Sequence, residues 1–392
     1  MAWMSFITLL LAVLFLTLNH NGVVGGRSTL SSEEQLEHNK IVVTEFGHTY
    51  DCVDIQQQPA LSHPQFKNYK VQMEPSFSLK QSIGKTSPLH ENSEATISRV
   101  DCPRGTVPIR RTDKEHLDRM KSFAELYDSS IHPQTKDQPG RQFAILKSYG
   151  RKHRYHGIQS YINVQQPFVN YDQLSASQLW IEVTVDDEFN SLQAGWIVYP
   201  ELYRDNLTHF FSYYKIIKAG IHRYCFNAIC SPGFVQVSAT FPVDAVISPI
   251  SVYAGEQREI FVYIQQDRTK NNWWLKCGNE FIGYWPESLV PQLARDGASY
   301  VAWGGFTKGP PGGPSPPMGN GKPFNWWMQQ YQFQSYFYGL KIVNPSNYLE
   351  DIKDRTKYIS NQDCYGLRYI GPEKKGQVNV IYLGGTGGNC GV

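Results

Sequence analysis

The spacing of apolar residues changes near Phe143, and this change divides the chain into two parts. After this point, short runs rich in Val, Ile, Tyr and Trp alternate with breaks of Gly, Pro, Asn and Asp. Such runs, with no helical periodicity between them, predict about a dozen short β-strands. The expected strands include Gly157–Val164, Gln178–Val185, Leu192–Tyr199, Phe210–Ile217, Phe234–Thr240, Glu259–Gln265, Trp273–Cys277, Ser299–Gly304, Tyr336–Val343 and Val378–Leu383. The pattern favours an all-β fold, an antiparallel sandwich or barrel.

The part before this boundary, residues 27–127, mixes extended and helical segments. Apolar residues recur at helical spacing after Thr112 and predict a helix that ends at about Tyr127. Serines and glutamates from Ser31 onward resemble a capped helix start. The extended segments are Lys40–Phe46, Tyr69–Met73 and Pro103–Arg111. We therefore expect a small α+β domain here. A linker follows at residues 128–142, where Pro, Gly and polar residues favour proteolytic processing.

The first residues have the composition of a secretory leader. Ala2 to Leu18 form an apolar run without a charged side chain, and small residues follow as far as Gly26. This pattern predicts a signal peptide over residues 1–26. A signal anchor that stays in the membrane is the alternative, although the run is slightly short for a span. We expect a secreted, extracellular protein with no stable membrane association after cleavage.

Composition excludes two classes of protein. Only 18% of the 392 residues are charged and 14% are aromatic, which excludes wholesale disorder. The formal net charge of +2 gives no electrostatic case for nucleic-acid binding.

The seven cysteines fit an oxidising compartment, since six can pair and one is left over. There is no CxxC pair and no HExxH motif, and the eleven histidines are scattered, so we expect no metal and no cofactor. Asn206-Leu207-Thr208 is a sequon and predicts N-glycosylation at Asn206.

Several longer motifs resemble the plant neprosin family. Those similar to its activation peptide are Asp51-Cys52-Val53-Asp54, Gln58-Pro59-Ala60, His63-Pro64 and the run from Cys102 to Arg111. Those similar to its catalytic domain are Gly195-Trp196, Val198, Pro200, Tyr203, Asp205-Asn206, Cys225 with Cys230, Pro232 to Gln236, Asn272 to Leu275, Gly283-Tyr284-Trp285-Pro286 and Trp303-Gly304-Gly305. The resemblance covers nearly the whole chain after the leader.

The resemblance implies a layout, an activity and a disulfide pattern. It implies an activation propeptide over residues 27–127, then a β-sandwich of two antiparallel sheets, jelly-roll or concanavalin-like, over residues 143–392. Family members are glutamic endopeptidases that cut beside proline at acid pH, with two glutamates, a water and no metal. The implied bridges are Cys52–Cys102, Cys225–Cys230 and Cys364–Cys390. Cys277 then stays free, as a half-buried strand thiol or, alternatively, for intermolecular pairing. We expect a monomer in the apoplast or cell wall, with a proline-containing peptide or extracellular polypeptide as partner.

Both family glutamates are replaced in this chain. The position before Ala-Gly-Trp is Gln193, and the position after Trp-Gly-Gly is Phe306. Peptide hydrolysis by carboxyl groups needs one group to take a proton from water and another to give a proton to the leaving amine. Gln193 can still donate a hydrogen bond, whereas Phe306 has neither a proton to exchange nor hydrogen-bonding capacity. The sequence therefore predicts loss of the reaction.

Other residues could keep part of the function. The remaining carboxylates of the β-rich part are interpreted as solvated loop charges: Glu182, Asp186, Asp187, Glu188, Glu201 and Glu287. Aromatic rings of the retained motifs are either a cleft that binds proline-bearing peptides or inter-sheet core: Trp196, Tyr284, Trp285 and Trp303. Three hypotheses follow: a pseudo-peptidase that still binds peptides, an active endopeptidase with an unrecognised acid pair, or a structural protein whose cleft is filled by Phe306.

Overall fold

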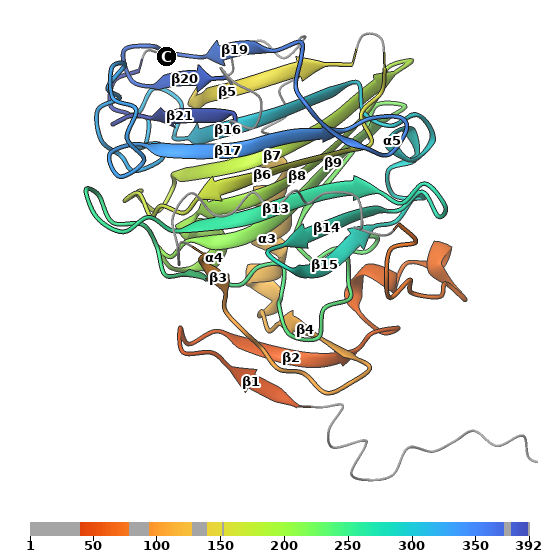
Figure 1. Cartoon of the computed structure of the whole chain (residues 1–392). Helices are drawn as coiled ribbons and strands as arrows, with labels where there is room; N and C mark the ends of the chain where they lie inside the picture. Colours follow the sequence, from red (N-terminus) through yellow and green to blue (C-terminus); the bar gives the residue numbers. More distant parts are fainter. Residues whose placement is uncertain (1–39, 78–93, 128–138, 151–152, 372–377, 391–392) are drawn as a thin grey trace, which may run out of the picture. The chain divides into compact units, whose positions relative to one another are not determined.

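The computed structural model describes residues 40–77, 94–127, 139–150, 153–371 and 378–390 (Figure 1). The predicted signal peptide and the helix expected from Ser31 lie outside the described residues, as does most of the predicted linker. Across the described part of the chain, none of the helices combines the length and the apolar character that crossing a bilayer requires.

Two large antiparallel sheets dominate the described residues and confirm the all-β sandwich (Figure 1). The seven-stranded sheet runs in the order β10 (Ile221–Phe226), β9 (His209–Lys218), β8 (Glu188–Val198), β7 (Leu174–Val185), β16 (Tyr300–Lys308), β5 (Arg141–Tyr149) and β19 (Thr356–Ile359). The nine-stranded sheet runs β11 (Val235–Gln236), β15 (Glu280–Trp285), β14 (Trp273–Cys277), β13 (Glu259–Gln266), β6 (Gly157–Asn163), β17 (Ser335–Val343), β21 (Val380–Gly384) and β20 (Gly366–Ile370), with β18 (Leu349–Asp351) paired to β17.

The core lies between these two sheets. Alternate side chains of each strand point inward, as the two-residue period of a strand requires. The side chains of Trp196 and Trp303 lie between the two sheets. Their indole N–H groups donate to the backbone oxygens of Asn163 and Gln159 on β6, at 2.8 Å and 3.0 Å. These bonds satisfy buried donors and hold the sheets in a fixed alignment.

The N-terminal part forms a small α+β arrangement. β1 (Ile41–Val43), β2 (Thr49–Asp54) and β4 (Thr106–Arg110) make a three-stranded sheet. The helix expected up to Tyr127 is present as α3 (Lys114–Tyr127). The remaining short elements are η1 (Pro59–Leu61), η2 (Pro64–Phe66), β3 (Thr96–Ile97), which pairs with β12 (Ile247–Ser248), α4 (Pro200–Tyr203) and α5 (Pro291–Asp296).

Three of the segments that we expected differ markedly from the structure. β5 begins at Arg141, inside the range interpreted as a linker. The segment Tyr69–Met73 forms no strand. The strand expected over Phe234–Thr240 shrinks to β11, because the Ser238 hydroxyl accepts hydrogen bonds from the backbone N–H of Thr240 and of Phe241 and turns the chain away.

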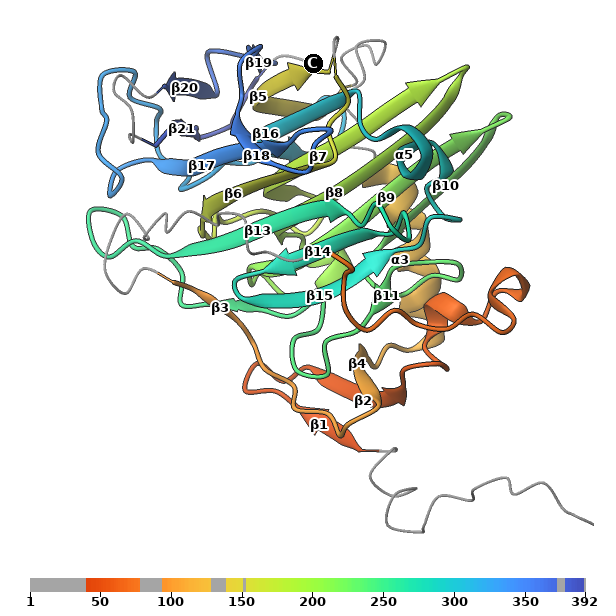
Figure 2. The same cartoon turned by 45° about the vertical axis from the view of Figure 1, so that its right-hand side comes forward.

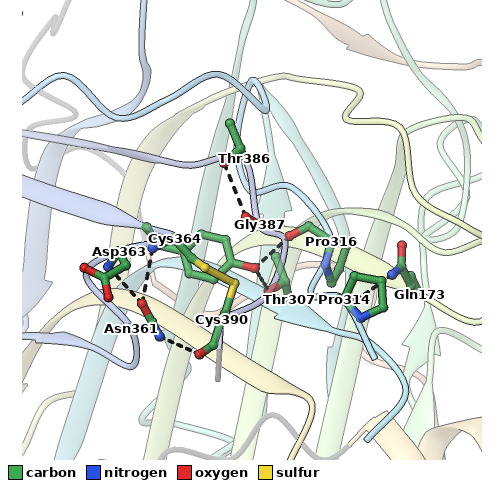
Figure 3. Close-up of a disulfide and its surroundings, with 11 residues drawn as sticks. Gln173, Thr307, Pro314, Pro316, Asn361, Asp363, Cys364, Thr386, Gly387 and Cys390 are labelled. Atoms are coloured by element: carbon green, nitrogen blue, oxygen red, sulfur yellow. Dashed lines mark hydrogen bonds between the residues drawn. A yellow bond between two sulfur atoms is a disulfide. The ribbon is translucent and has the colours of Figure 1, made fainter. Parts of the chain in front are cut away.

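The disulfides join Cys52 to Cys102, Cys225 to Cys230 and Cys364 to Cys390, the pairing that the resemblance implies, and Cys277 is free and buried. Figure 3 shows the last bridge. Asn361 supports it from both sides, because its side-chain oxygen accepts from the Cys364 N–H and its amide donates to the Cys390 backbone oxygen. Nearby, the Thr307 and Tyr365 hydroxyls are 3.1 Å apart, and Thr307 follows Phe306 directly. The bridge therefore anchors loops beside one of the two substituted positions.

Candidate functional site

Gln193 and Phe306 lie on the same face of the seven-stranded sheet. β7 separates their strands: Gln193 is opposite Trp180, and Phe306 is opposite Ala176. Trp180 and Ala176 are an even number of residues apart, so their side chains share one face of β7. This is the outer face, away from the inter-sheet core, and both Gln193 and Phe306 are fully buried on it. The fold places the two positions that the resemblance assigns to catalysis on one face, separated by β7 and by four positions along it.

A chain of hydrogen bonds fixes the Gln193 side chain. Its oxygen accepts from the Gln178 amide at 2.8 Å, and its own amide donates to the Ser191 hydroxyl at 3.0 Å. The Ser191 hydroxyl donates onward to Glu182 at 2.9 Å. At the other end, the Tyr127 hydroxyl donates to the Gln178 oxygen at 2.7 Å. The carboxamide thus lies in a buried, ordered network, and its position carries no group that titrates.

Glu182 corrects one of our sequence interpretations. It is not a solvated loop charge: it lies within β7, is 1% exposed and faces Ser191 and Tyr300 on the neighbouring strands. β7 runs to Val185, the end expected for this strand, and the turn follows at Asp186 and Asp187, which both have positive φ. A charged side chain four residues before a turn gives no local signal that it is buried.

This carboxylate changes the electrostatics of the face. Burial, and then the Glu182 charge, raise the pKa of Tyr300 well above its usual value, so this phenol stays protonated. Among the described residues, the buried glutamates are Glu182 and Glu259. Glu259 belongs to the nine-stranded sheet, where it accepts hydrogen bonds from the hydroxyls of Tyr336 and Tyr338. The described residues therefore place one buried glutamate, rather than a pair, beside Gln193.

Phe306 fills its part of the face with aromatic contacts. Its ring centroid lies 4.9 Å from that of Phe143 and 5.3 Å from that of Tyr127, and the side chain has no exposed surface. A phenyl ring in such a cluster offers no partner to a water molecule and excludes it. The position that the resemblance assigns to a carboxylate is a packed, apolar site in this chain.

Helix α3 of the N-terminal part covers this face, on the side of β9 and β10 (Figure 2). Met120, Phe123, Ala124 and Tyr127 from the helix pack into one cluster with the residues of the sheet face. The Tyr213 hydroxyl also donates to the Ala124 backbone oxygen at 2.9 Å. The face that carries Gln193 and Phe306 is therefore occupied by the protein's own N-terminal part.

The four aromatic residues considered as a cleft do not line this face. Trp196 and Trp303 each lie three residues from a substituted position, Gln193 or Phe306, and an odd separation along a strand points a side chain to the opposite face. Both belong to the inter-sheet core, as does Trp285. Tyr284 is buried under the N-terminal part: its hydroxyl lies 3.0 Å from that of Tyr69 and accepts from the Gln72 N–H. All four rings are buried, but only Trp196, Trp285 and Trp303 belong to the inter-sheet core, and the spacing could have revealed this for Trp196 and Trp303.

Two other features lie near the start of β9, a predicted sequon and a group of side chains that the sequence did not predict. Asn206 of the sequon is exposed, and the hydroxyl of Thr208 is buried and donates to the Gln165 backbone oxygen at 2.8 Å. Three side chains with metal-ligating atoms, His48, Asp205 and His209, lie together beside it. No motif or spacing in the sequence predicted this group.

Comparison with known proteins places this geometry in context. The sequence model of the Neprosin domain matches residues 171–386, and that of the Neprosin activation peptide matches residues 41–156. The second match continues past the boundary expected near Phe143.

Among solved structures, the chain is similar to scytalido-glutamic peptidase with a transition-state analogue inhibitor, at 10% identity and a TM-score of 0.31, over 62% of this chain and 98% of that one. SCP-B, a member of the eqolisin family of peptidases in complex with the tripeptide Ala-Ile-His, matches at 10% identity and a TM-score of 0.29, with the same coverage. A GH16 protein of Bacteroides ovatus in complex with a product matches at 12% identity and a TM-score of 0.27, over 45% of this chain and 70% of that one.

Proposed function

The chain belongs to the neprosin family, and on this basis we propose that it is a secreted pseudo-peptidase that retains peptide binding without peptide hydrolysis. The observation that carries the proposal is the apolar packing of Phe306 against Phe143 and Tyr127. A general acid or base contributes about 10²–10⁴-fold to a rate. Replacing both proton carriers therefore removes most of the catalytic advantage.

Secretion rests on sequence features. The predicted signal peptide, three disulfides and the exposed sequon at Asn206 all favour an extracellular, glycosylated protein. We propose the apoplast or cell wall as the site of action, because the resemblance is to a plant family.

Peptide binding would use the face that α3 covers. Without the helix, this face would offer the rings of Trp180, Phe211 and Phe306 beside the Gln193 carboxamide. Aromatic surfaces with a few fixed polar groups are what proline-rich extended peptides bind in other proteins. We infer that the N-terminal part must leave before a peptide can bind.

The alternative, an endopeptidase with an unrecognised acid pair, is favoured by one observation. Glu182 is buried and reaches Gln193 through Ser191. One carboxylate could accept a proton from water, yet the leaving amine would still need a second proton carrier. We propose this activity as the lesser candidate.

The experiment uses the full-length chain with a site-specific protease sequence inserted between residues 128 and 138, so that the N-terminal part can be cut from the sandwich. Hydrolysis of a proline-containing peptide is measured at acid pH, before and after cutting. We expect no turnover from the unmodified chain, and a gain in the double variant Gln193→Glu, Phe306→Glu after cutting. The matched control is Gln193→Glu, Phe306→Gln. The glutamine at position 306 has the size of glutamate but no carboxyl proton to exchange.

Two outcomes would overturn the proposal. Turnover by the unmodified chain that survives Phe306→Ala, and is lost in Glu182→Gln, would establish the active alternative. Binding is measured by titrating the cut, unmodified chain with a proline-rich peptide. If this titration shows no binding, the peptide-binding part of the proposal fails and the structural hypothesis takes its place.

A further inference from the structure

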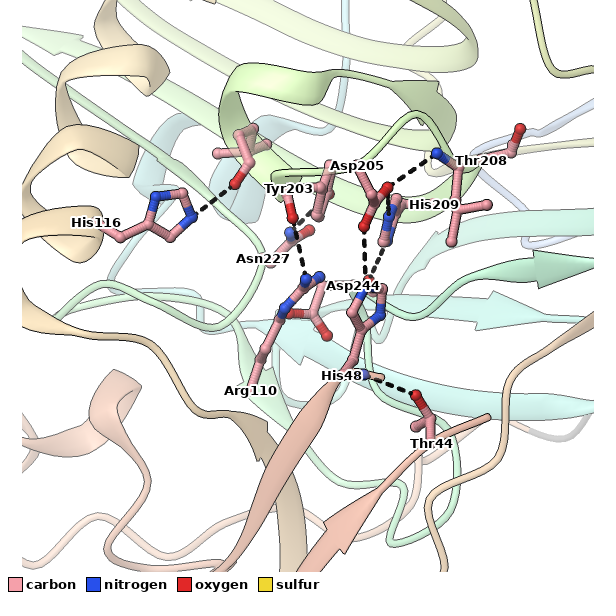
Figure 4. A network of polar contacts seen from close by, with 12 residues as sticks. Thr44, His48, Arg110, His116, Tyr203, Asp205, Thr208, His209, Asn227 and Asp244 are labelled. Atoms are coloured by element: carbon pink, nitrogen blue, oxygen red, sulfur yellow. Dashed lines mark hydrogen bonds and ion pairs between the residues drawn. The ribbon is translucent and has the colours of Figure 1, made fainter. Parts of the chain in front are cut away.

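The turn between β1 and β2 meets the sandwich at a compact group of ligand atoms (Figure 4). His48 comes from this turn, whereas Asp205 and His209 come from the sandwich, where His209 opens β9. The two carboxylate oxygens of Asp205 are shared between the rings: the Nε2 of His48 lies 2.9 Å from one oxygen, and the Nε2 of His209 lies 2.9 Å from the other. All the ligand atoms lie within 4.8 Å of one another.

His209 has more hydrogen-bond acceptors around it than a neutral ring can serve. Its Nδ1 lies 2.9 Å from the Asp244 backbone oxygen, and its Nε2 faces the Asp205 carboxylate. Both partners only accept hydrogen bonds, whereas a neutral imidazole carries one N–H. A cation bound by Nε2 and the carboxylate would relieve this shortage of donors.

The surroundings hold the ring in place. His209 is fully buried and its ring stacks on Tyr203, with centroids 3.8 Å apart. The Nδ1–H bond to a backbone oxygen is also the outer contact that metal-bound histidines usually make, since it directs the Nε2 lone pair toward the metal. The Leu207 N–H donates to Asp205 at 2.9 Å and fixes the carboxylate in the same way.

The charged side chains around the group have a net negative charge, which favours binding of a dication. Asp205 and Asp244 bring two negative charges, and Arg110 brings one positive charge, with its guanidinium over the Tyr203 ring. The group is half-enclosed rather than sealed, because the side chains of His48 and Asp205 are 11% and 21% exposed. An ion could therefore enter from solvent and keep a water as its fourth ligand.

We propose that His48, Asp205 and His209 form a Zn²⁺ site that joins the N-terminal part to the sandwich. Two imidazole nitrogens and one carboxylate oxygen are ligands typical of zinc, and small shifts of the side chains would reach its tetrahedral geometry. Because one ligand comes from the β1–β2 turn and two come from the sandwich, the bound ion would hold these two parts of the chain together. Its release would loosen the N-terminal part, which also carries helix α3 over the face of Gln193 and Phe306.

The test uses the untagged full-length chain after treatment with EDTA and dialysis. Zinc binding is measured by competition with a chromophoric chelator, and bound zinc is counted by mass spectrometry. We expect one tightly bound zinc per chain. His48→Asn can keep a hydrogen bond to Asp205 but is a poor zinc ligand, and it should weaken binding by more than the roughly 10–100-fold that loss of a residue supporting a ligand costs. His222→Ala, an exposed histidine of β10, is the matched control and should bind as the unmodified chain does.

A second measurement separates loss of ligation from loss of folding. His48→Cys offers a thiolate in place of the imidazole, so Co²⁺ should bind with a thiolate charge-transfer band that the unmodified chain lacks. Zinc should also slow limited proteolysis of the N-terminal part in the unmodified chain but not in His48→Asn. The proposal is overturned if zinc binds the unmodified chain no more tightly than His48→Asn, or if His48→Cys gives no such band. The group would then be a hydrogen-bonded contact alone.

Discussion

Tyr127 is the residue that ties helix α3 most directly to the candidate site. Its side chain is fully buried, and its hydroxyl donates to Gln178, the next member of the network after Gln193. Its ring centroid lies 6.2 Å from Phe211, 4.7 Å from Tyr213, 4.7 Å from Phe226 and 5.3 Å from Phe306. Substitution at this one position should therefore weaken the cover over the whole face.

Two substitutions separate the hydrogen bond from the ring. Tyr127→Phe takes one donor from the buried Gln178 oxygen, which costs about 1–3 kcal/mol. Tyr127→Ala also removes the ring from its four aromatic neighbours, and loss of a buried aromatic side chain costs about 3–5 kcal/mol. Since each ~1.4 kcal/mol is a factor of ten in an equilibrium constant, the helix should open about 5- to 150-fold more often in Tyr127→Phe. In Tyr127→Ala, the increase should exceed roughly 100-fold.

Hydrogen–deuterium exchange of the peptide covering Lys114–Tyr127 measures this opening directly. Ser122→Ala is the control on the same helix, because Ser122 is exposed. It should change the free energy of helix opening by less than about 0.5 kcal/mol. If exchange in Tyr127→Ala matched exchange in Ser122→Ala, the helix would not be held by this face, and our account of the covered site would be refuted.

Two further predictions concern buried titratable groups. Burial raises the pKa of the Cys277 thiol far above its usual value, so a thiol reagent at pH 8 should label no cysteine in the native chain and one per chain in denaturant. Native labelling, or a disulfide-linked dimer, would contradict this. Burial also lowers the pKa of His156, whose Nδ1 lies 2.7 Å from the Gln266 side-chain oxygen. Its folded state therefore favours the neutral ring, and this part of the stability is present above about pH 6.5 and is lost as the pH falls. His156→Gln should flatten the acid-side decline of the urea midpoint, and an unchanged slope would argue against it.

Local sequence patterns predicted the helices and strands whose own residues show a clear apolar periodicity or β-rich composition. The helix that ends at Tyr127 was found from its apolar spacing, and the strand Trp273–Cys277 was predicted with its observed bounds. β10, Ile221–Phe226, was missed because it is an edge strand whose first three residues are all exposed, so its residues do not alternate. What α3 covers could not be predicted, because Tyr213 and Phe306 are distant in sequence and meet it only after the sheet has formed.

In the candidate site, too, some features could be predicted from the sequence and others could not. The resemblance located Gln193 and Phe306, and the two-residue period could have placed Trp196 and Trp303 on the opposite face. Glu182 lies inside the strand expected over Gln178–Val185, but a charged residue within a strand gives no local signal that its side chain is buried. The contact between His48 and Asp205 spans 157 positions along the chain, so no motif with fixed spacing could have indicated it.

The network around Ser191 makes a last prediction, which separates position 193 from position 306. Gln193→Glu would place a second carboxyl group next to the hydroxyl that already serves Glu182. Burial and the mutual repulsion of two carboxylates raise the pKa of at least one of them, so the pair should hold a proton in the folded state. A raised folded pKa contributes stability that is present below the unfolded value of about 4.3 and is lost as the pH rises. The urea midpoint of Gln193→Glu should therefore lie closest to that of the unmodified chain near pH 4 and fall below it toward pH 7. Gln193→Met, which cannot ionise, should show the same deficit at both pH values. A deficit of Gln193→Glu that does not change with pH would show that the two side chains do not share one buried network.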